Sequence, residues 1–99
     1  MLARLIAAML LACSPAAVTQ ADPADAPPGA SSCSGCHPAS ERAVTPVPRL
    51  AGRNPTEIVQ AMRAFRLGQT PTTIMDRVAK GFSEEEIAAI AAWYAAQQD

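Results

Sequence analysis

The chain has only one histidine, His37, and four aromatic residues: Phe65, Phe82, Trp93 and Tyr94. With no second histidine and no paired carboxylates in a pocket-like pattern, the sequence offers no set of side chains for acid–base catalysis. Excess basic charge is also absent, because 8 Lys and Arg residues are balanced by 9 Asp and Glu residues, which gives a net charge of −1. A nucleic-acid-binding surface requires a basic face, so the sequence predicts no nucleic-acid partner.

The hydrophobic run near the N-terminus, residues 5–12, is too short to cross a membrane, which requires roughly 20 residues. It follows Arg4 and precedes a stretch of small residues, and this order is typical of a signal peptide. Because a cut after Ala21 fits the pattern, the sequence predicts a signal peptide over residues 1–21 and export to the periplasm. A second interpretation is a lipoprotein leader that ends before Cys13, and only then would a lipid anchor the chain to a membrane.

Cysteine is scarce, and two of the three cysteines, Cys33 and Cys36, precede His37 in the run Cys-Ser-Gly-Cys-His. This C-x-x-C-H pattern indicates the attachment of a c-type haem. Positions three apart share one face of a helical turn, so the two thiols can reach along one edge of a flat porphyrin. His37 follows directly and projects beneath the ring, where it can bind the iron. The sequence therefore predicts one covalently bound haem c.

Three other uses of the cysteine pair compete with haem attachment. A closed zinc site requires four ligands, and beyond this motif the chain has only Cys13, which lies in the predicted leader. A thioredoxin-like redox pair requires a βαβ setting, and no strand-like alternation occurs nearby. A disulfide between Cys33 and Cys36 stays an alternative in an exported chain.

Removal of residues 1–21 takes away one charged side chain, Arg4, and leaves about 78 of the 99 residues with a net charge of −2. A core of this size rarely contributes more than ~3–5 kcal/mol by itself, and the aromatic residues are few. A covalently held, largely apolar macrocycle would supply the missing centre of the core. Residues 22–30, which contain Pro and Gly, are predicted to be a flexible linker, and residues 31–99 are the single predicted domain.

Two helices can be placed by their capping residues. Asn54 followed by Pro55 is typical of a helix start, and Gly68 is typical of the end of that helix. Ser83 and Glu86 form a capping box at the start of a last helix, which is expected to run to about residue 98. The inner faces of these helices are expected to be Ile58, Met62 and Phe65 in the first, and Ile87, Ile90, Ala91 and Tyr94 in the last.

The regions before and between these helices are expected to be short or irregular. Ser31 or Ser32 is predicted to cap a short helix that carries the C-x-x-C-H motif. Prolines make residues 38–53 a loop.

Met75 is the predicted second ligand of the iron. Met1 and Met9 are lost with the leader, and Met62 falls on the apolar stripe of its helix, which favours a role in the core. Met75 instead follows Pro71 and three threonines, so it is expected in a loop or at the edge of an element. A thioether is a soft, neutral donor that raises the reduction potential of haem iron.

Three stretches of the sequence resemble class I cytochromes c. They are Pro48-Arg49-Leu50-Ala51-Gly52, the helix through Ala64-Phe65-Arg66 with Gly68, and the run from Ile74 to Ile87. Within that family the chain is most similar to the monohaem cytochrome subunit of flavocytochrome c sulfide dehydrogenase, over roughly residues 31–98. The resemblance implies a small all-α fold, about three to four helices around one covalently attached haem, with His37 and Met75 as axial ligands. Two features depart from the family: Pro and Gly break the segment before Cys33, and Pro38 follows the histidine where glycine is common.

The resemblance also implies roles for residues around the haem. A proline carbonyl in the Pro-x-Leu-x-Gly loop would accept the second ring N–H of His37, and here that proline is Pro48, with Pro46 as the competing choice. The expected walls of the haem pocket are Leu50, Ile74 and Phe82.

The function that these features predict is single-electron transfer by a periplasmic monohaem cytochrome c, which is not itself an enzyme. As a member of the resembled subgroup, it would accept electrons from a flavoprotein dehydrogenase of the sulfide-oxidising type, and catalysis would belong to that partner. The alternative is a haem enzyme or gas sensor with an open sixth coordination position. That alternative would follow if Met75 does not reach the iron.

Overall fold

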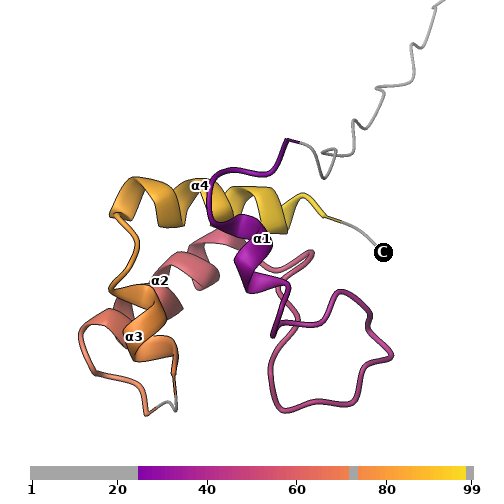
Figure 1. Ribbon diagram of the computed structural model, residues 1–99, viewed down its shortest axis with the longest axis horizontal. Helices are drawn as coiled ribbons and strands as arrows, with labels where there is room; N and C mark the ends of the chain where they lie inside the picture. Colours follow the sequence, from indigo (N-terminus) through magenta and orange to yellow (C-terminus); the bar gives the residue numbers. More distant parts are fainter. Residues whose placement is uncertain (1–24, 72–73, 98–99) are drawn as a thin grey trace, which may run out of the picture.

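The computed structural model describes residues 25–71 and 74–97, and it is all-α over these segments, without a strand. Four helices follow one another along the chain (Figure 1), and they are α1 (Ala30–Cys33), α2 (Pro55–Arg66), α3 (Met75–Ala79) and α4 (Glu84–Ala95). The helical fold expected from the family resemblance is confirmed. The predicted signal peptide and Cys13 lie outside the described residues, and within the described ranges no helix has the length and apolar character needed to cross a membrane.

The ends of α2 lie where the sequence predicts them. The side-chain oxygen of Asn54 accepts a hydrogen bond from the backbone N–H of Thr56 at 2.8 Å. Pro55 occupies the first helical position, where a backbone N–H would have no partner within the helix. After Leu67, Gly68 adopts a φ of 67°, a conformation that glycine reaches without strain.

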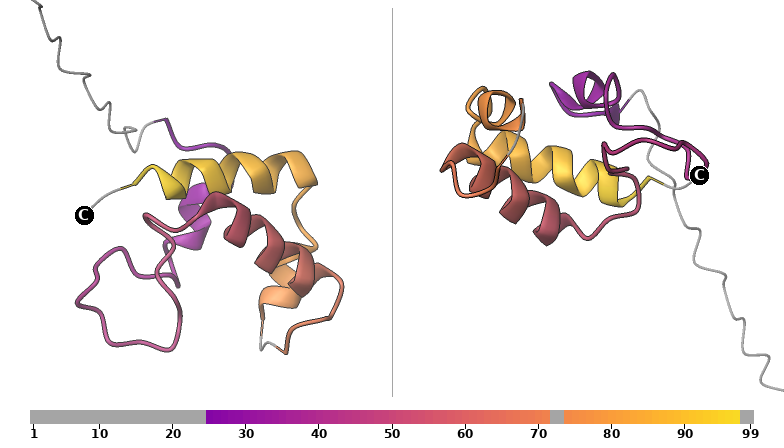
Figure 2. Two further views of the ribbon diagram at one scale, coloured as in Figure 1. Left: turned by 180° about the vertical axis from the view of Figure 1, so that it is seen from behind. Right: turned by 90° about the horizontal axis from the view of Figure 1, so that it is seen from below.

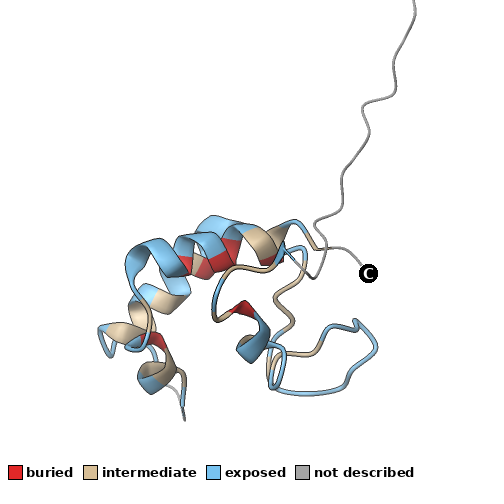
Figure 3. Cartoon of the chain, turned by 45° about the horizontal axis from the view of Figure 1, so that its top comes forward, coloured by how far each residue is buried: buried red, intermediate tan, exposed pale blue. Residues whose placement is uncertain are grey.

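The start of α4 is the predicted capping box. The Ser83 hydroxyl oxygen accepts the backbone N–H of Glu86 at 3.1 Å, and the Glu86 carboxylate accepts the backbone N–H of Ser83 at 2.9 Å. The helix ends at Ala95, earlier than expected. Its buried face is the predicted one (Figure 3), and it consists of Ile87, Ile90, Ala91 and Tyr94.

The cap of α1 differs from the prediction. The N-cap is Gly29, with a φ of 87°, and no side chain caps the helix. The prediction that Ser31 or Ser32 is the cap is therefore wrong, because both lie inside the helix and the Ser32 hydroxyl donates to the Gly29 carbonyl at 2.6 Å. A Cβ atom on Gly29 would lie 2.5 Å from the ring of Phe82, so this turn requires glycine both for its backbone conformation and for its close approach to the residue that precedes the N-cap of α4.

The packed part of the chain begins before residue 31. Ala30 is fully buried, and Ala26 packs against the same core. Of the linker expected over residues 22–30 only residues 25–30 are described.

The helices pack around α2, which contacts both α3 and α4. In Figures 1 and 2, α1 and α3 lie at separate places along the pair formed by α2 and α4, with α3 near the start of α4 and α1 nearer to its end. The hydrophobic core joins α1, α2 and α4 and consists of Ala30, Ile58, Ile90, Ala91 and Tyr94. This core is small, and no large side chain of the described residues is completely buried.

Arg49 links the two sides of the long loop that connects α1 to α2. The Nε atom of Arg49 donates to the carbonyl of Ala39 at 2.7 Å, and its Nη1 atom lies 3.4 Å from a carboxylate oxygen of Glu41. These contacts join the outgoing and returning parts of the loop. The returning part carries Pro48 to the turn that follows α1.

Candidate cofactor site

An apolar cavity between the helices contains the side chains that the sequence singled out. Cys33, Cys36, His37 and Met75 all line it. Its space free of protein atoms is about 1030 Å³, counting the part open to solvent. The apolar residues of its wall, including the three predicted ones, are Pro48, Leu50, Ile58, Ala61, Met62, Phe65, Ile74, Val78, Phe82, Ile87 and Ile90.

The turn after α1 brings two thiols and an imidazole to this cavity. The backbone N–H groups of Cys36 and His37 both donate to the carbonyl of Cys33, at 3.2 and 2.9 Å. This tight turn holds the motif together although Cys36 and His37 lie beyond the end of α1. Cys33 is half-buried and Cys36 is exposed, and no disulfide joins them. Burial raises the pKa of the Cys33 thiol.

A backbone carbonyl orients His37. The Nδ1 atom lies 2.5 Å from the carbonyl oxygen of Pro48, so with its proton on Nδ1 the ring donates a hydrogen bond to this oxygen. The tautomer leaves the lone pair on Nε2, and a carbonyl partner on the other nitrogen is the usual arrangement for a histidine that binds a metal. The contact is made by Pro48, the proline that the family resemblance favoured over Pro46.

Tyr94, on α4, forms a hydrogen bond that holds α1 in place. Its hydroxyl donates to the carbonyl of Ala30 at 2.6 Å, and its own carbonyl accepts the backbone N–H of Gly52 at 3.0 Å. One residue therefore connects α1, α4 and the loop that follows Pro48. Burial, followed by the nearby Cys33, raises the pKa of Tyr94. The ring of Trp93 contacts Tyr94 edge-on, with 4.9 Å between ring centroids.

Two methionines line the cavity, Met62 from α2 and Met75 from α3. Met75 is the first residue of α3, at the edge of an element as predicted, and it is half-buried. Met62 also packs against the hydrophobic core, as its place on the apolar stripe of α2 predicts. The cavity by itself therefore offers two thioethers as candidate ligands.

The described residues fit a covalently held haem. Large apolar side chains of α2, α3 and α4 line the cavity, while the protein core is small, so a flat apolar group in the cavity would complete the core. A c-type haem uses two thiols for covalent attachment, and an oriented imidazole and a thioether as ligands of its iron. A zinc ion fits less well, because residues 25–71 and 74–97 contain no group of three or more His, Cys, Asp or Glu side chains that could hold a metal ion.

Sequence reasoning missed two contacts near the site. One is the close approach of Gly29 to Phe82. The other is made by Arg66, which donates to the carbonyls of Ala79 and Phe82. Both contacts join residues far apart in the chain, and no local pattern indicates such partners.

No protein-family model matches the chain. It is 36% identical over 63 residues to the cytochrome subunit of sulfide dehydrogenase from Chlorobaculum tepidum, a match that covers 64% of this chain and 57% of that protein. The match thus spans less than two thirds of the length of that relative. The chain is also 34% identical over 70 residues to cytochrome c-554(548) from Halomonas halodenitrificans, and here 67% of this chain and 84% of the relative are covered.

Proposed function

Because the chain belongs to the class I c-type cytochromes, we propose that Cys33 and Cys36 attach one haem c and that His37 and Met75 bind its iron. The protein transfers electrons and is not itself an enzyme. The observation that supports these residue roles is the shared cavity, where two thiols, a carbonyl-oriented imidazole and a thioether lie on apolar walls.

The haem supplies an iron that alternates between the ferrous and ferric states. The carbonyl of Pro48 holds the ring of His37 in one orientation and makes its Nε2 a better donor. Met75 supplies a soft, neutral sulfur that favours the ferrous state and raises the reduction potential. The wall beside both ligands is apolar, and it would limit the access of water to a bound haem.

Electrons reach the site on the side of Cys36. Cys36 is exposed and Cys33 is half-buried, so a group attached to both sulfurs has one edge near solvent and the rest within the apolar wall. An exposed edge allows electrons to pass to a docked protein without a substrate pocket.

The partner is a redox protein, and in this proposal it is a flavoprotein dehydrogenase that oxidises sulfide. One relative of the chain is the cytochrome subunit of a sulfide dehydrogenase, which supports this choice. The protein would work in the periplasm after removal of residues 1–21, with a membrane anchor only if Cys13 carries a lipid.

Paired methionine substitutions test the axial ligand. Met75→Ala should abolish the weak sulfur-to-iron charge-transfer band of the oxidised protein, because its sulfur is the proposed ligand. Met62→Ala should retain the band and lower the free energy of unfolding by roughly 2 kcal/mol, as expected for a truncated core side chain. Absorption spectra and denaturant unfolding of the two holoproteins provide these measurements.

The opposite pattern, with the band lost in Met62→Ala and kept in Met75→Ala, would assign the ligand to Met62. Rapid carbon monoxide binding to the reduced protein, at a rate that Met75→Ala does not change, would indicate an open sixth position. In that case the protein would be a haem enzyme or gas sensor.

A further inference from the structure

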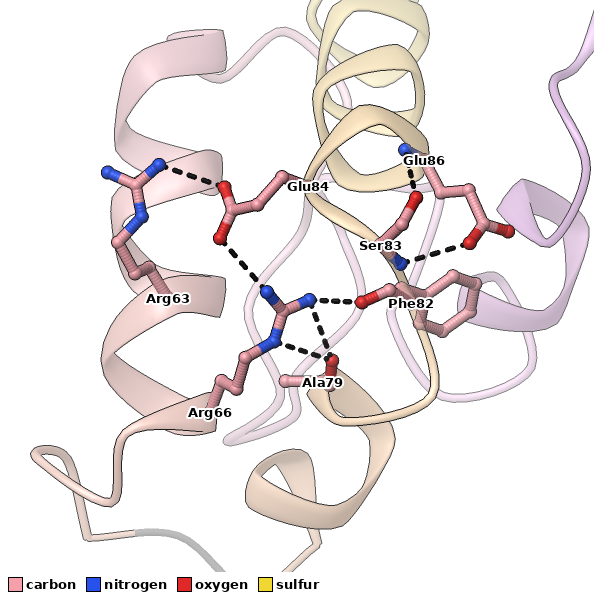
Figure 4. Close-up of polar contacts among 7 residues, drawn as sticks. All are labelled: Arg63, Arg66, Ala79, Phe82, Ser83, Glu84 and Glu86. Carbon is pink, nitrogen blue, oxygen red and sulfur yellow. Dashed lines mark hydrogen bonds and ion pairs between the residues drawn. The ribbon is translucent and has the colours of Figure 1, made fainter.

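Arg66, the last residue of α2, donates hydrogen bonds to two carbonyls outside its own helix (Figure 4). Its Nε and Nη2 atoms lie 3.4 and 3.3 Å from the carbonyl oxygen of Ala79, and Nη2 also donates to the carbonyl of Phe82. Its Nη1 atom forms an ion pair with Glu84 at 2.9 Å. The Arg66 side chain is 24% exposed. One guanidinium therefore joins the end of α3, the turn after it and the start of α4.

The short helix α3 depends on contacts of this kind. A helix of five residues is not stable alone, and its N-cap residue, Ile74, makes no side-chain capping bond. The helix packs against α2, and its last residue, Ala79, is fully buried. The carbonyl of Ala79 belongs to the last turn, where carbonyls lack partners within the helix. Arg66 supplies a charged donor to this carbonyl and so holds the end of α3 on α2.

We propose that Arg66 is a positioning residue for the axial methionine, because it fixes the place of α3 relative to the cavity wall on α2. This inference rests on the proposed ligation of iron by Met75. Met75 begins the helix that Ala79 ends, so the two residues are about 6 Å apart along the helix axis. A displacement of Ala79 therefore displaces the Met75 sulfur as well.

Arg63 provides a matched control. It lies one turn earlier on α2 and shares the carboxylate of Glu84, with Nη2 2.8 Å from the glutamate oxygen. Its hydrogen bond goes to this carboxylate rather than to α3, and its side chain is 55% exposed. Asn54 provides a control for stability, because it caps the opposite end of α2.

The test measures the rate at which imidazole binds to the oxidised holoprotein, since imidazole can bind only after Met75 has left the iron. Arg66→Ala should accelerate binding by about ten- to a hundredfold, as expected for the loss of hydrogen bonds from a charged donor, and should weaken the charge-transfer band. Arg66→Lys keeps the charge but loses the planar fork, so its rate should be intermediate. Arg63→Ala and Asn54→Ala should bind imidazole at the wild-type rate, although denaturant unfolds Asn54→Ala more easily.

The proposal is overturned if both Arg66 variants bind imidazole at the wild-type rate, or if Arg63→Ala accelerates binding as much as Arg66→Ala does. If Arg66→Ala gives no folded holoprotein, the rate of Arg66→Lys decides by the same criterion. If Met75→Ala loses the charge-transfer band but the Arg66 variants keep it at wild-type strength, this inference alone is overturned. A band and a binding rate that Met75→Ala leaves unchanged overturn the ligation by Met75 and the role of Arg66 together.

Discussion

Side chains in and near the cavity form hydrogen bonds with backbone carbonyls. His37 bonds the carbonyl of Pro48, and Tyr94 bonds that of Ala30. Arg66 does the same at the end of α3. A carbonyl oxygen is placed by the course of the chain and is the same in every residue type. Each of these hydrogen bonds therefore ties a side chain to a loop or a helix end, and the position of that segment helps to set the geometry of the site.

Tyr94→Phe tests how much one such hydrogen bond contributes to the free energy of unfolding. Because Tyr94 is buried and its hydroxyl bonds the carbonyl of Ala30, loss of the hydroxyl leaves a buried acceptor without this donor. The variant should lower the free energy of unfolding by about 1–2 kcal/mol, as measured by denaturant titration of the holoprotein.

Ser32→Ala is the control for Tyr94→Phe. It removes a hydroxyl-to-carbonyl hydrogen bond of the same length, 2.6 Å, but at an exposed position. Its effect should be smaller, within about 0.5 kcal/mol. Equal effects of the two substitutions would contradict the importance assigned to burial.

At the scale of elements, the site depends on how α4 begins. The capping box holds Ser83 and Glu86 together at the first turn, and Glu84 in the same turn accepts hydrogen bonds from the two arginines of α2. Hydrogen bonds therefore hold the first turn of α4 together and also connect it to α2. Charge at this turn should therefore influence the stability of the helical fold.

The capping box predicts a pH dependence. Hydrogen bonds from the Ser83 backbone, and then from its side chain, lower the pKa of Glu86 below its ordinary value of 4.5. Because the folded-state pKa is the lower one, the stabilisation by Glu86 is present above pH 4.5 and is lost as the pH falls through the folded-state pKa. Glu86→Gln should therefore melt below the wild type at neutral pH, and the difference should shrink in acid, as followed by thermal unfolding.

Glu85→Gln is the control, since Glu85 lies in the same first turn but outside the capping box. A difference between wild type and Glu86→Gln that is constant with pH would refute this account of the turn.

The elements also differ in how far the sequence could predict them. The boundaries of α2, the start of α4 and its buried face were predictable, because capping residues and apolar periodicity are local signals. The helix α3 was not predicted as such, because five residues after a Pro/Thr segment form a helix only with support from α2. The contact of Arg66 with Ala79 crosses 13 positions, and only the folded chain reveals it.

At the scale of the whole molecule, many of the apolar residues line a cavity. The side chains of four helices line it, and the core beside it is small. The cysteine pair and His37 could be proposed as the haem-attachment site from the sequence alone, because that motif consists of adjacent residues. The choice between Met62 and Met75 depends on tertiary structure, since both thioethers line the cavity. The molecule is thus expected to need its cofactor for a complete core.

The most direct test of the account is the intact mass of the exported protein, made in cells that also contain the haem-attachment machinery, together with the mass of the peptide that carries Cys33 and Cys36. The account predicts a red protein that carries the added mass of one haem on this peptide, and no such addition in the double variant Cys33→Ala/Cys36→Ala. A colourless wild-type protein whose mass equals that of the polypeptide alone would contradict it.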